Sequence, residues 1–141
     1  MKQIFAALSR HAAERPKDIA FREPARSITW AELAREVGAR AASLRPAVLG
    51  LGLSGIDYVI ADLAATLAGC RVVPVPSFFS PAQVRHLLAD AGAELLDRLP
   101  DPETPPLPLD YAGGAERVIY TSGTTGQPKG VVLGDRQLDA S

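Results

Sequence analysis

The stretch Tyr120-Thr121-Ser122-Gly123-Thr124-Thr125-Gly126-Gln127-Pro128-Lys129-Gly130 gathers three glycines, three threonines, a serine and a lysine between two apolar runs. Glycine lets a backbone approach a ligand closely, so several amide N–H groups can point into one concavity. The hydroxyl groups add short hydrogen-bond donors, and Lys129 adds a compact positive charge. These residue types indicate a loop that binds a polyphosphate, although the same composition is also typical of an ordinary turn.

The loop differs from the Walker A motif, in which G-x-x-x-x-G-K-[ST] leads into a helix. Here Gly123, Gly126 and Lys129 are spaced three apart, and a β-branched run follows. The flanking segments 117–120 and 131–133 have the composition of strands. The loop is therefore expected to join strand to strand.

The ordered string from Tyr120 to Val131 resembles the phosphate-loop signature of the AMP-forming adenylating enzymes. This superfamily includes acyl- and aryl-CoA synthetases, nonribosomal peptide adenylation domains and luciferases. The resemblance implies that the loop holds the β- and γ-phosphates of ATP. The residues that it assigns to nucleotide binding are Thr121, Ser122, Gly123, Thr124, Thr125, Gly126, Lys129 and Gly130. It assigns no catalytic residue and no metal ligand within this chain.

Two earlier segments are similar to other elements of the superfamily and occur in the same order. Residues 28–33, Ile-Thr-Trp-Ala-Glu-Leu, resemble its T-[YW]-x-E-L element, and residues 64–75 resemble its A-x-L-x-A-G-x-x-x-V-P-[LV] element. Residues 76–83 are more similar to acyl-CoA synthetases than to amino-acid-activating domains. The resemblance thus covers nearly the whole chain, and we expect residues 1–141 to form a partial AMP-binding domain with its phosphate loop at 120–131.

By this resemblance, the complete enzyme uses ATP, with Mg²⁺, to convert a fatty or aryl carboxylic acid into an acyl-adenylate, and CoA then accepts the acyl group. Three departures matter. The usual S-H-R after the loop is Gly134-Asp135-Arg136, the usual G-D-x-V strand lead-in is absent, and the sequence stops at Ser141. The adenine, ribose, metal and C-terminal lysine motifs belong to later sequence, so we expect negligible adenylation by this chain alone.

Composition bounds the remaining possibilities. The 141 residues allow one domain with a modest core, and 47% hydrophobic and 22% charged residues are typical of a soluble globular protein. The net charge of −1, with both signs interspersed, gives no electrostatic case for nucleic acid or a membrane surface. No transmembrane span or signal peptide is apparent, and a lone Cys70 suits a reducing compartment. The cytoplasm is the expected location.

Helices and strands alternate along the chain, which predicts an α/β fold with a mostly parallel sheet flanked by helices. We interpret it as the incomplete, N-terminal part of the large domain of an adenylate-forming enzyme. A Pro-rich connection is expected at 100–114. The expected helices span 3–14, 31–44, 56–67 and 81–91, with a last one from 136, and the expected strands span 19–22, 27–30, 48–53, 71–76, 95–96, 117–120 and 131–133.

Local signals support these boundaries. Thr29 with Glu32, and Ser80 with Gln83, predict capping boxes. Gly69 and Gly92 are expected to end helices, and Asp135 to cap the last one. Trp30 is expected to be a core aromatic, His11 to have a surface or packing role, and His86 to be solvated.

Other interpretations stay open. Gly50, Gly52 and Gly55 suggest a dinucleotide fingerprint, but no suitable acidic residue follows about twenty residues later at the end of a strand. The chain could be a non-catalytic remnant or interaction module that pairs with a separately encoded remainder or with itself, or a phosphate-binding regulatory protein of an unrelated family. An incomplete parallel sheet predicts an unpaired edge and an exposed apolar face, hence aggregation or a partner.

Overall fold

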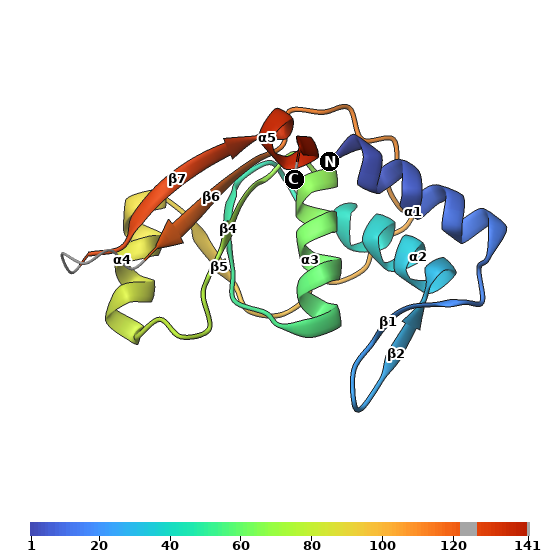
Figure 1. The fold of residues 1–141 in the computed structure, drawn as a ribbon, viewed down its shortest axis with the longest axis horizontal. Coiled ribbons are helices and arrows are strands. Elements are labelled where there is room, and N and C mark those ends of the chain that lie inside the picture. The colour runs from blue at the N-terminus through green and yellow to red at the C-terminus, as the bar shows by residue number, and fades with distance from the viewer. Residues whose placement is uncertain (122–126, 141) are drawn as a thin grey trace.

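The computed structural model describes residues 1–121 and 127–140. A five-stranded sheet runs in the order β5-β3-β4-β6-β7, beside a separate two-stranded hairpin, β1–β2 (Figure 1). The helices are α1 (Lys2–Glu14), α2 (Trp30–Ala41), α3 (Gly55–Leu67), α4 (Pro81–Ala91) and α5 (Asp135–Ala140). The strands are β1 (Ile19–Arg22), β2 (Ser27–Thr29), β3 (Val48–Leu51), β4 (Arg71–Pro74), β5 (Glu94–Leu96), β6 (Glu116–Thr121) and β7 (Lys129–Gly134).

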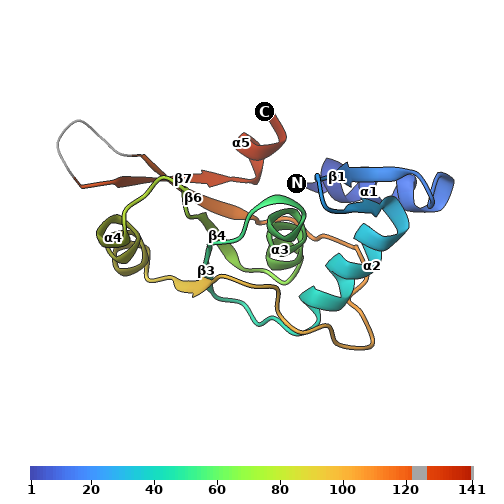
Figure 2. The ribbon, with the colours of Figure 1, turned by 90° about the horizontal axis from the view of Figure 1, so that it is seen from below.

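Four strands of the large sheet are parallel, and β7 is antiparallel to β6. The crossover from β3 through α3 leads to β4, whereas the crossover from β4 through α4 leads back past β3 to β5. Because these connections run in opposite directions across the sheet, their helices cover opposite faces. Figure 2 shows α3 and α4 on the two sides of the central strands. The predicted fold class, an α/β fold with a mostly parallel sheet, is confirmed.

Side-chain alternation along the strands builds two cores on the two faces of the sheet. On the α3 face, Leu49 and Val72 pack with Ala61 and Ala65 of the helix. On the α4 face, Val73 and Val118 pack with Leu87. Gly50 lies on this second face, where an added Cβ would come within 2.7 Å of Leu88, so its glycine serves close packing between β3 and α4.

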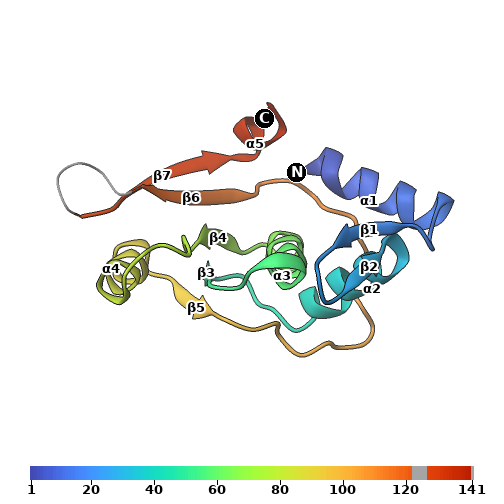
Figure 3. The same ribbon diagram turned by 60° about the horizontal axis from the view of Figure 1, so that its bottom comes forward.

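The helices α1, α2 and α3 enclose a third core on the side of the β1–β2 hairpin, with Phe5, Leu33, Val37 and Ile60 at its centre. On α1, Phe5 and Leu8 are buried, whereas Ile4 is 46% exposed. The two ends of the chain lie near one another (Figure 3), and the Met1 amino group is 3.7 Å from Asp135.

The predicted helix-start signals are confirmed. Both capping boxes form: Thr29 and Ser80 accept hydrogen bonds from the backbone of Glu32 and Gln83, whose side chains accept in return. The helix α4 ends at Gly92 in the left-handed conformation. Gly69 has a positive φ directly after the cap of α3, Ala68. The helix α2 ends three residues earlier than expected, at Ala41.

The prediction that Asp135 caps the last helix is wrong. Asp135 is the first residue of α5, and its carboxylate accepts hydrogen bonds from the Tyr111 hydroxyl, at 2.8 Å, and the Gly114 amide, at 2.7 Å. The Pro-rich segment 100–114 has no regular structure, and the amides of Glu103 and Leu107 in it donate to carbonyl groups of α2.

Candidate functional site

The glycine-rich loop joins β6 to β7 at the tip of an antiparallel hairpin, as expected for a strand-to-strand connection. The register pairs Tyr120 with Gly130 and Thr121 with Lys129. Thr121, Lys129 and Gly130 are exposed, so two of the side chains predicted to bind phosphate emerge side by side where the hairpin enters the loop. The other predicted residues, Ser122, Gly123, Thr124, Thr125 and Gly126, lie outside the described residues.

Helix α4 lies against this end of the hairpin (Figure 1) and contacts it on both sides of the loop. The Tyr120 hydroxyl donates to Asp90 at 2.7 Å, just before the loop. The His86 Nε2 lies 3.0 Å from the carbonyl oxygen of Pro128, just after it. His86 is half-buried, so the expectation of a solvated histidine is wrong; helical periodicity identified its face of α4 but could not show that the hairpin covers it.

Gly130 is required for packing as well as for the loop motif. A Cβ added at Gly130 would lie 2.7 Å from a methyl group of Val118 and 2.9 Å from the ring of Tyr120. Real Cβ atoms do not approach so closely, so any larger residue must displace this ring. Glycine at this position thus lets Tyr120 cross its neighbouring strand and reach Asp90.

The protonation state of Tyr120 suits its role as a donor. Burial, and then the hydrogen bond to Asp90 and its negative charge, raise the pKa of Tyr120 to about 12. The hydroxyl therefore keeps its proton throughout the physiological range and donates to a carboxylate. The hydrogen bond from Tyr120 to Asp90 therefore does not depend on the ionisation of Tyr120 near neutral pH.

Replacing Tyr120 with phenylalanine should lower the free energy of unfolding by about 1–2 kcal/mol, because it removes a hydrogen bond to a charged acceptor at a partly exposed site. Chemical denaturation monitored by circular dichroism measures the change. Asp90→Ala removes the acceptor and should cost a similar amount, and the double variant should cost clearly less than the sum. Additive effects would show that the two residues do not interact.

The described residues offer no ready-made metal site. No cluster of three or more His, Cys, Asp or Glu side chains able to hold a metal ion occurs among residues 1–121 and 127–140. The polar groups at the hairpin end are hydroxyl, ammonium and amide donors, which suit phosphate oxygens rather than a cation.

Arg117 lies on the opposite face of β6 from Tyr120, and its side chain points to α3. It makes a bidentate pair with Asp62, in which Arg117 Nη1 lies 2.9 Å from Asp62 Oδ2. The Arg117 side chain is 10% exposed and that of Asp62 18%. Burial raises the pKa of Asp62, and the hydrogen bonds and charge of Arg117 oppose that rise. Sequence reasoning missed this pair, because its members are 55 residues apart and lie on elements whose pairing only the topology reveals.

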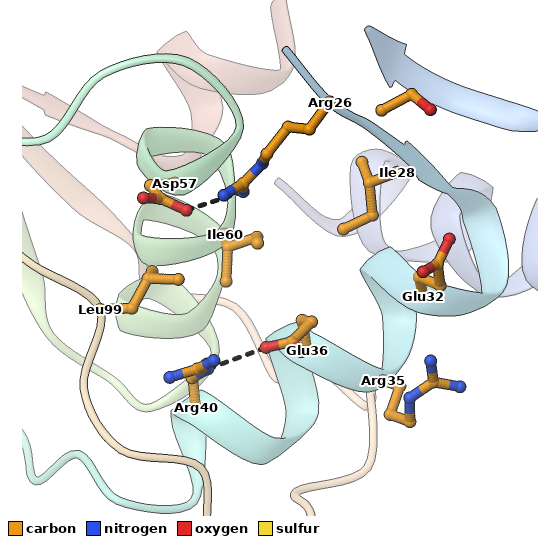
Figure 4. Close-up of a pocket in the computed structure, with 10 residues that line it drawn as sticks. Arg26, Ile28, Glu32, Arg35, Glu36, Arg40, Asp57, Ile60 and Leu99 are labelled. Atoms are coloured by element: carbon orange, nitrogen blue, oxygen red, sulfur yellow. Dashed lines mark hydrogen bonds and ion pairs between the residues drawn. The ribbon is translucent and has the colours of Figure 1, made fainter. Parts of the chain in front are cut away.

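A polar pocket of about 240 Å³ lies away from the loop, between α2, α3 and the end of the β1–β2 hairpin (Figure 4). Arg26 pairs with Asp57 at 2.8 Å, and Arg40 pairs with Glu36 at 2.8 Å. These charges satisfy one another across the pocket wall. We therefore assign the candidate site to the hairpin end and not to this pocket.

Comparison with known proteins gives the family. A sequence model of the AMP-binding enzyme family matches residues 8–107, which is well over half of the chain. The chain belongs to the AMP-binding enzyme family. The matched segment ends before the glycine-rich loop, so this assignment does not depend on the motif at 120–131.

Individual relatives of this chain are adenylating enzymes of more than one kind. An alignment of 170 positions, gaps included, gives 31% identity to the isonitrile lipopeptide synthase of Streptomyces coeruleorubidus and covers 98% of this chain and 12% of that protein. The chain is 32% identical over 159 alignment positions to the feruloyl-CoA synthase of Amycolatopsis sp, covering 88% of this chain and 32% of the relative. The chain thus spans only a small part of the length of these relatives.

Solved structures share the fold. The N-terminal subdomain of Klebsiella oxytoca NpsA superposes with a TM-score of 0.75 at 23% identity, covering 94% of this chain and 42% of that one. The o-succinylbenzoate CoA synthetase of Bacillus subtilis, in complex with the acyl-adenylate intermediate OSB-AMP, gives 0.69 at 22% identity, covering 91% and 42%. The chain therefore shares the fold of about two fifths of each of these structures.

Proposed function

We propose that this chain supplies the ATP phosphate loop of an AMP-forming enzyme of the acyl-CoA synthetase type. The observation that carries the proposal is the end of the β6–β7 hairpin, where Thr121 and Lys129 lie side by side and exposed. Together with Ser122, Gly123, Thr124, Thr125, Gly126 and Gly130, they would form the loop at 120–131 of a partial AMP-binding domain. Its location would be the cytoplasm. Separately, none of the helices that the structure describes has the length and hydropathy of a membrane span.

The reaction that this loop would serve is the activation of a carboxylic acid. The carboxylate oxygen attacks the α-phosphorus of Mg–ATP in line, and pyrophosphate leaves. This step requires charge neutralisation and positioning more than a protein nucleophile. Lys129 and the loop hydroxyl and amide groups would hold the β- and γ-phosphates, which depart together as pyrophosphate.

The substrate in this proposal is a fatty or aryl acid, and CoA is the final acceptor of the acyl group. The related feruloyl-CoA synthase supports the CoA assignment. The sequence contains no segment resembling the adenine, ribose or C-terminal lysine motifs of the superfamily. We therefore expect these residues to bind the phosphates of ATP but to form no acyl-adenylate by themselves.

A comparison of ligands tests the proposal. With Mg²⁺ present, ATP and inorganic tripolyphosphate should bind the chain with similar, weak affinity in calorimetric titrations, because the phosphates make the main contacts. Adenosine should not bind. Binding of adenosine in preference to tripolyphosphate, or of neither phosphate ligand, would contradict the proposed phosphate loop.

A second proposal is that the chain acts as an interaction module that pairs with a polypeptide carrying the remainder of the fold, or with a second copy. Specific surfaces favour it. Strand β7 is an edge strand on which Val131 and Val132 are 55% and 56% exposed, although they point to opposite faces. An apolar groove of about 330 Å³ between α1, β1 and α3 is lined by Ile4, Phe21, Val59 and Leu63, among others.

If these surfaces require a partner, the isolated chain should self-associate. Multi-angle light scattering should give a mass above the 14.9 kDa of the monomer, rising with concentration. Val131→Lys combined with Val132→Thr should shift the distribution toward monomer, because a charge on an edge strand opposes strand pairing. A wild-type chain that stays monomeric at the highest attainable concentration would argue against this second proposal.

A further inference from the structure

Two side chains one turn apart on α4 contact the hairpin on either side of the glycine-rich loop. His86 and Asp90 are separated by four residues and so lie on the same face of the helix. Asp90 accepts from the Tyr120 hydroxyl at 2.7 Å, and His86 Nε2 lies 3.0 Å from the Pro128 carbonyl oxygen. One helix thus holds the strand that enters the loop and the strand that leaves it.

The helix that makes these contacts is itself firmly placed. A capping box and a proline in the first turn fix its start, and Leu87, fully buried between His86 and Asp90, packs in the core with Val73 and Val118. Breaking either contact therefore moves the hairpin more readily than it moves α4. The residues directly beyond the two contacts are Thr121 and Lys129, which pair with each other across the hairpin.

We propose that His86 and Asp90 are positioning residues that fix the relative placement of Thr121 and Lys129 for phosphate binding. The expected effect on phosphate binding rests on the proposed function, whereas the positioning of the two strands rests only on the two hydrogen-bond contacts. Because a carbonyl oxygen only accepts hydrogen bonds, His86 Nε2 must carry a proton toward Pro128. The histidine thus acts as a neutral donor or as an imidazolium, and not as a general base at this atom.

Three variants separate positioning from simple packing. His86→Leu keeps the bulk of the side chain and removes the donor. His86→Gln places an amide N–H group near the position of Nε2 and should restore the contact. His11→Leu removes the other histidine of the chain, on α1, where its ring contacts Trp30, and serves as the matched control.

The measurement is a titration of each full-length variant with Mg–ATP, followed by the amide signals of residues 120, 121, 129 and 130. His86→Leu should weaken binding about fivefold, the effect of one lost neutral hydrogen bond, whereas His86→Gln and His11→Leu should bind like the wild type. Tyr120→Phe should weaken binding independently through the other contact. Equal affinity of His86→Leu and the wild type would overturn the proposal.

A second readout needs no nucleotide. Long-range ¹H–¹⁵N spectra at a pH where the imidazole is neutral should show the proton of His86 on Nε2, and His86→Leu should shift the amide signals of Lys129 and Gly130. If the wild type fails to bind Mg–ATP but shows both features, the proposed function fails and the anchoring stands. If the proton is on Nδ1 and those amide signals do not move, the anchoring is refuted whatever the nucleotide result.

Discussion

Replacing Arg117 with methionine is expected to lower the free energy of unfolding by about 3 kcal/mol, near the lower end of the cost of breaking a buried ion pair. Methionine retains much of the length of the side chain but leaves the Asp62 carboxylate without its cationic partner. Both side chains are largely buried between α3 and β6, so water cannot replace the lost contact fully. Denaturant titration at pH 7 measures the loss.

The loss should depend on pH in a defined direction. Burial already raises the pKa of Asp62 in the folded protein against the opposing effect of Arg117. Without Arg117 that pKa should rise further, so the folded state binds a proton that the unfolded state, with an aspartate pKa of about 3.9, does not. Stability of the variant should therefore increase as the pH falls from 7 to 5, because protonation removes the unpaired charge.

Arg71→Met is the matched control. Arg71 on β4 pairs with Glu116 on β6, but both side chains are more than 40% exposed. An exposed pair contributes at most about 1 kcal/mol, so this variant should lose little stability and show no comparable rise toward pH 5. If Arg71→Met and Arg117→Met lowered the free energy of unfolding equally, burial of the Arg117–Asp62 pair would not explain its contribution to stability.

Replacing Lys129 with alanine is expected to reduce the affinity for Mg–ATP by about tenfold or more, which corresponds to the loss of one hydrogen bond between charged groups. Lys129 is exposed at the first position of β7, so its removal should change the stability of the fold little. Calorimetric titration measures the affinity, and thermal unfolding verifies that the variant is folded.

Lys17→Ala provides the comparison, since Lys17 is also exposed but lies between α1 and β1, in a different part of the fold. It should bind Mg–ATP like the wild type. If both lysine variants lose affinity equally, binding reflects net charge, and the assignment of Lys129 to the phosphate site is wrong.

Local chemistry made most elements predictable. The capping boxes at Thr29 and Ser80 and the glycine at 92 fixed helix ends to within a residue, because side-chain caps act over three or four positions. The β-branched runs on either side of the loop predicted β6 and β7. The end of α2 was less predictable, because residues 42–44 continue its apolar pattern but leave the helix in a turn.

The contacts around the loop could not be predicted, since they join residues far apart in sequence. Periodicity places His86 on a polar face, and only the crossing of α4 beneath the β6–β7 hairpin brings it to Pro128. Asp135 lies at the start of α5, a typical position for a capping residue. Its carboxylate instead accepts hydrogen bonds from the Tyr111 hydroxyl and the Gly114 amide, in the Pro-rich segment before β6. The motif from Tyr120 to Val131 located the candidate site, whereas only the folded structure shows the contacts of α4 that hold the hairpin in place.

An amide-resolved NMR titration of the 141-residue chain with Mg–ATP tests the central claim most directly. We expect a dispersed spectrum in which shifts concentrate at the hairpin end, at Thr121, Gln127, Lys129 and Gly130, with little change in the α1–α2 region. A dispersed spectrum that ATP leaves unchanged at these residues, or changes mainly around the pocket at Arg26 and Arg40, would contradict a phosphate site on the β6–β7 hairpin.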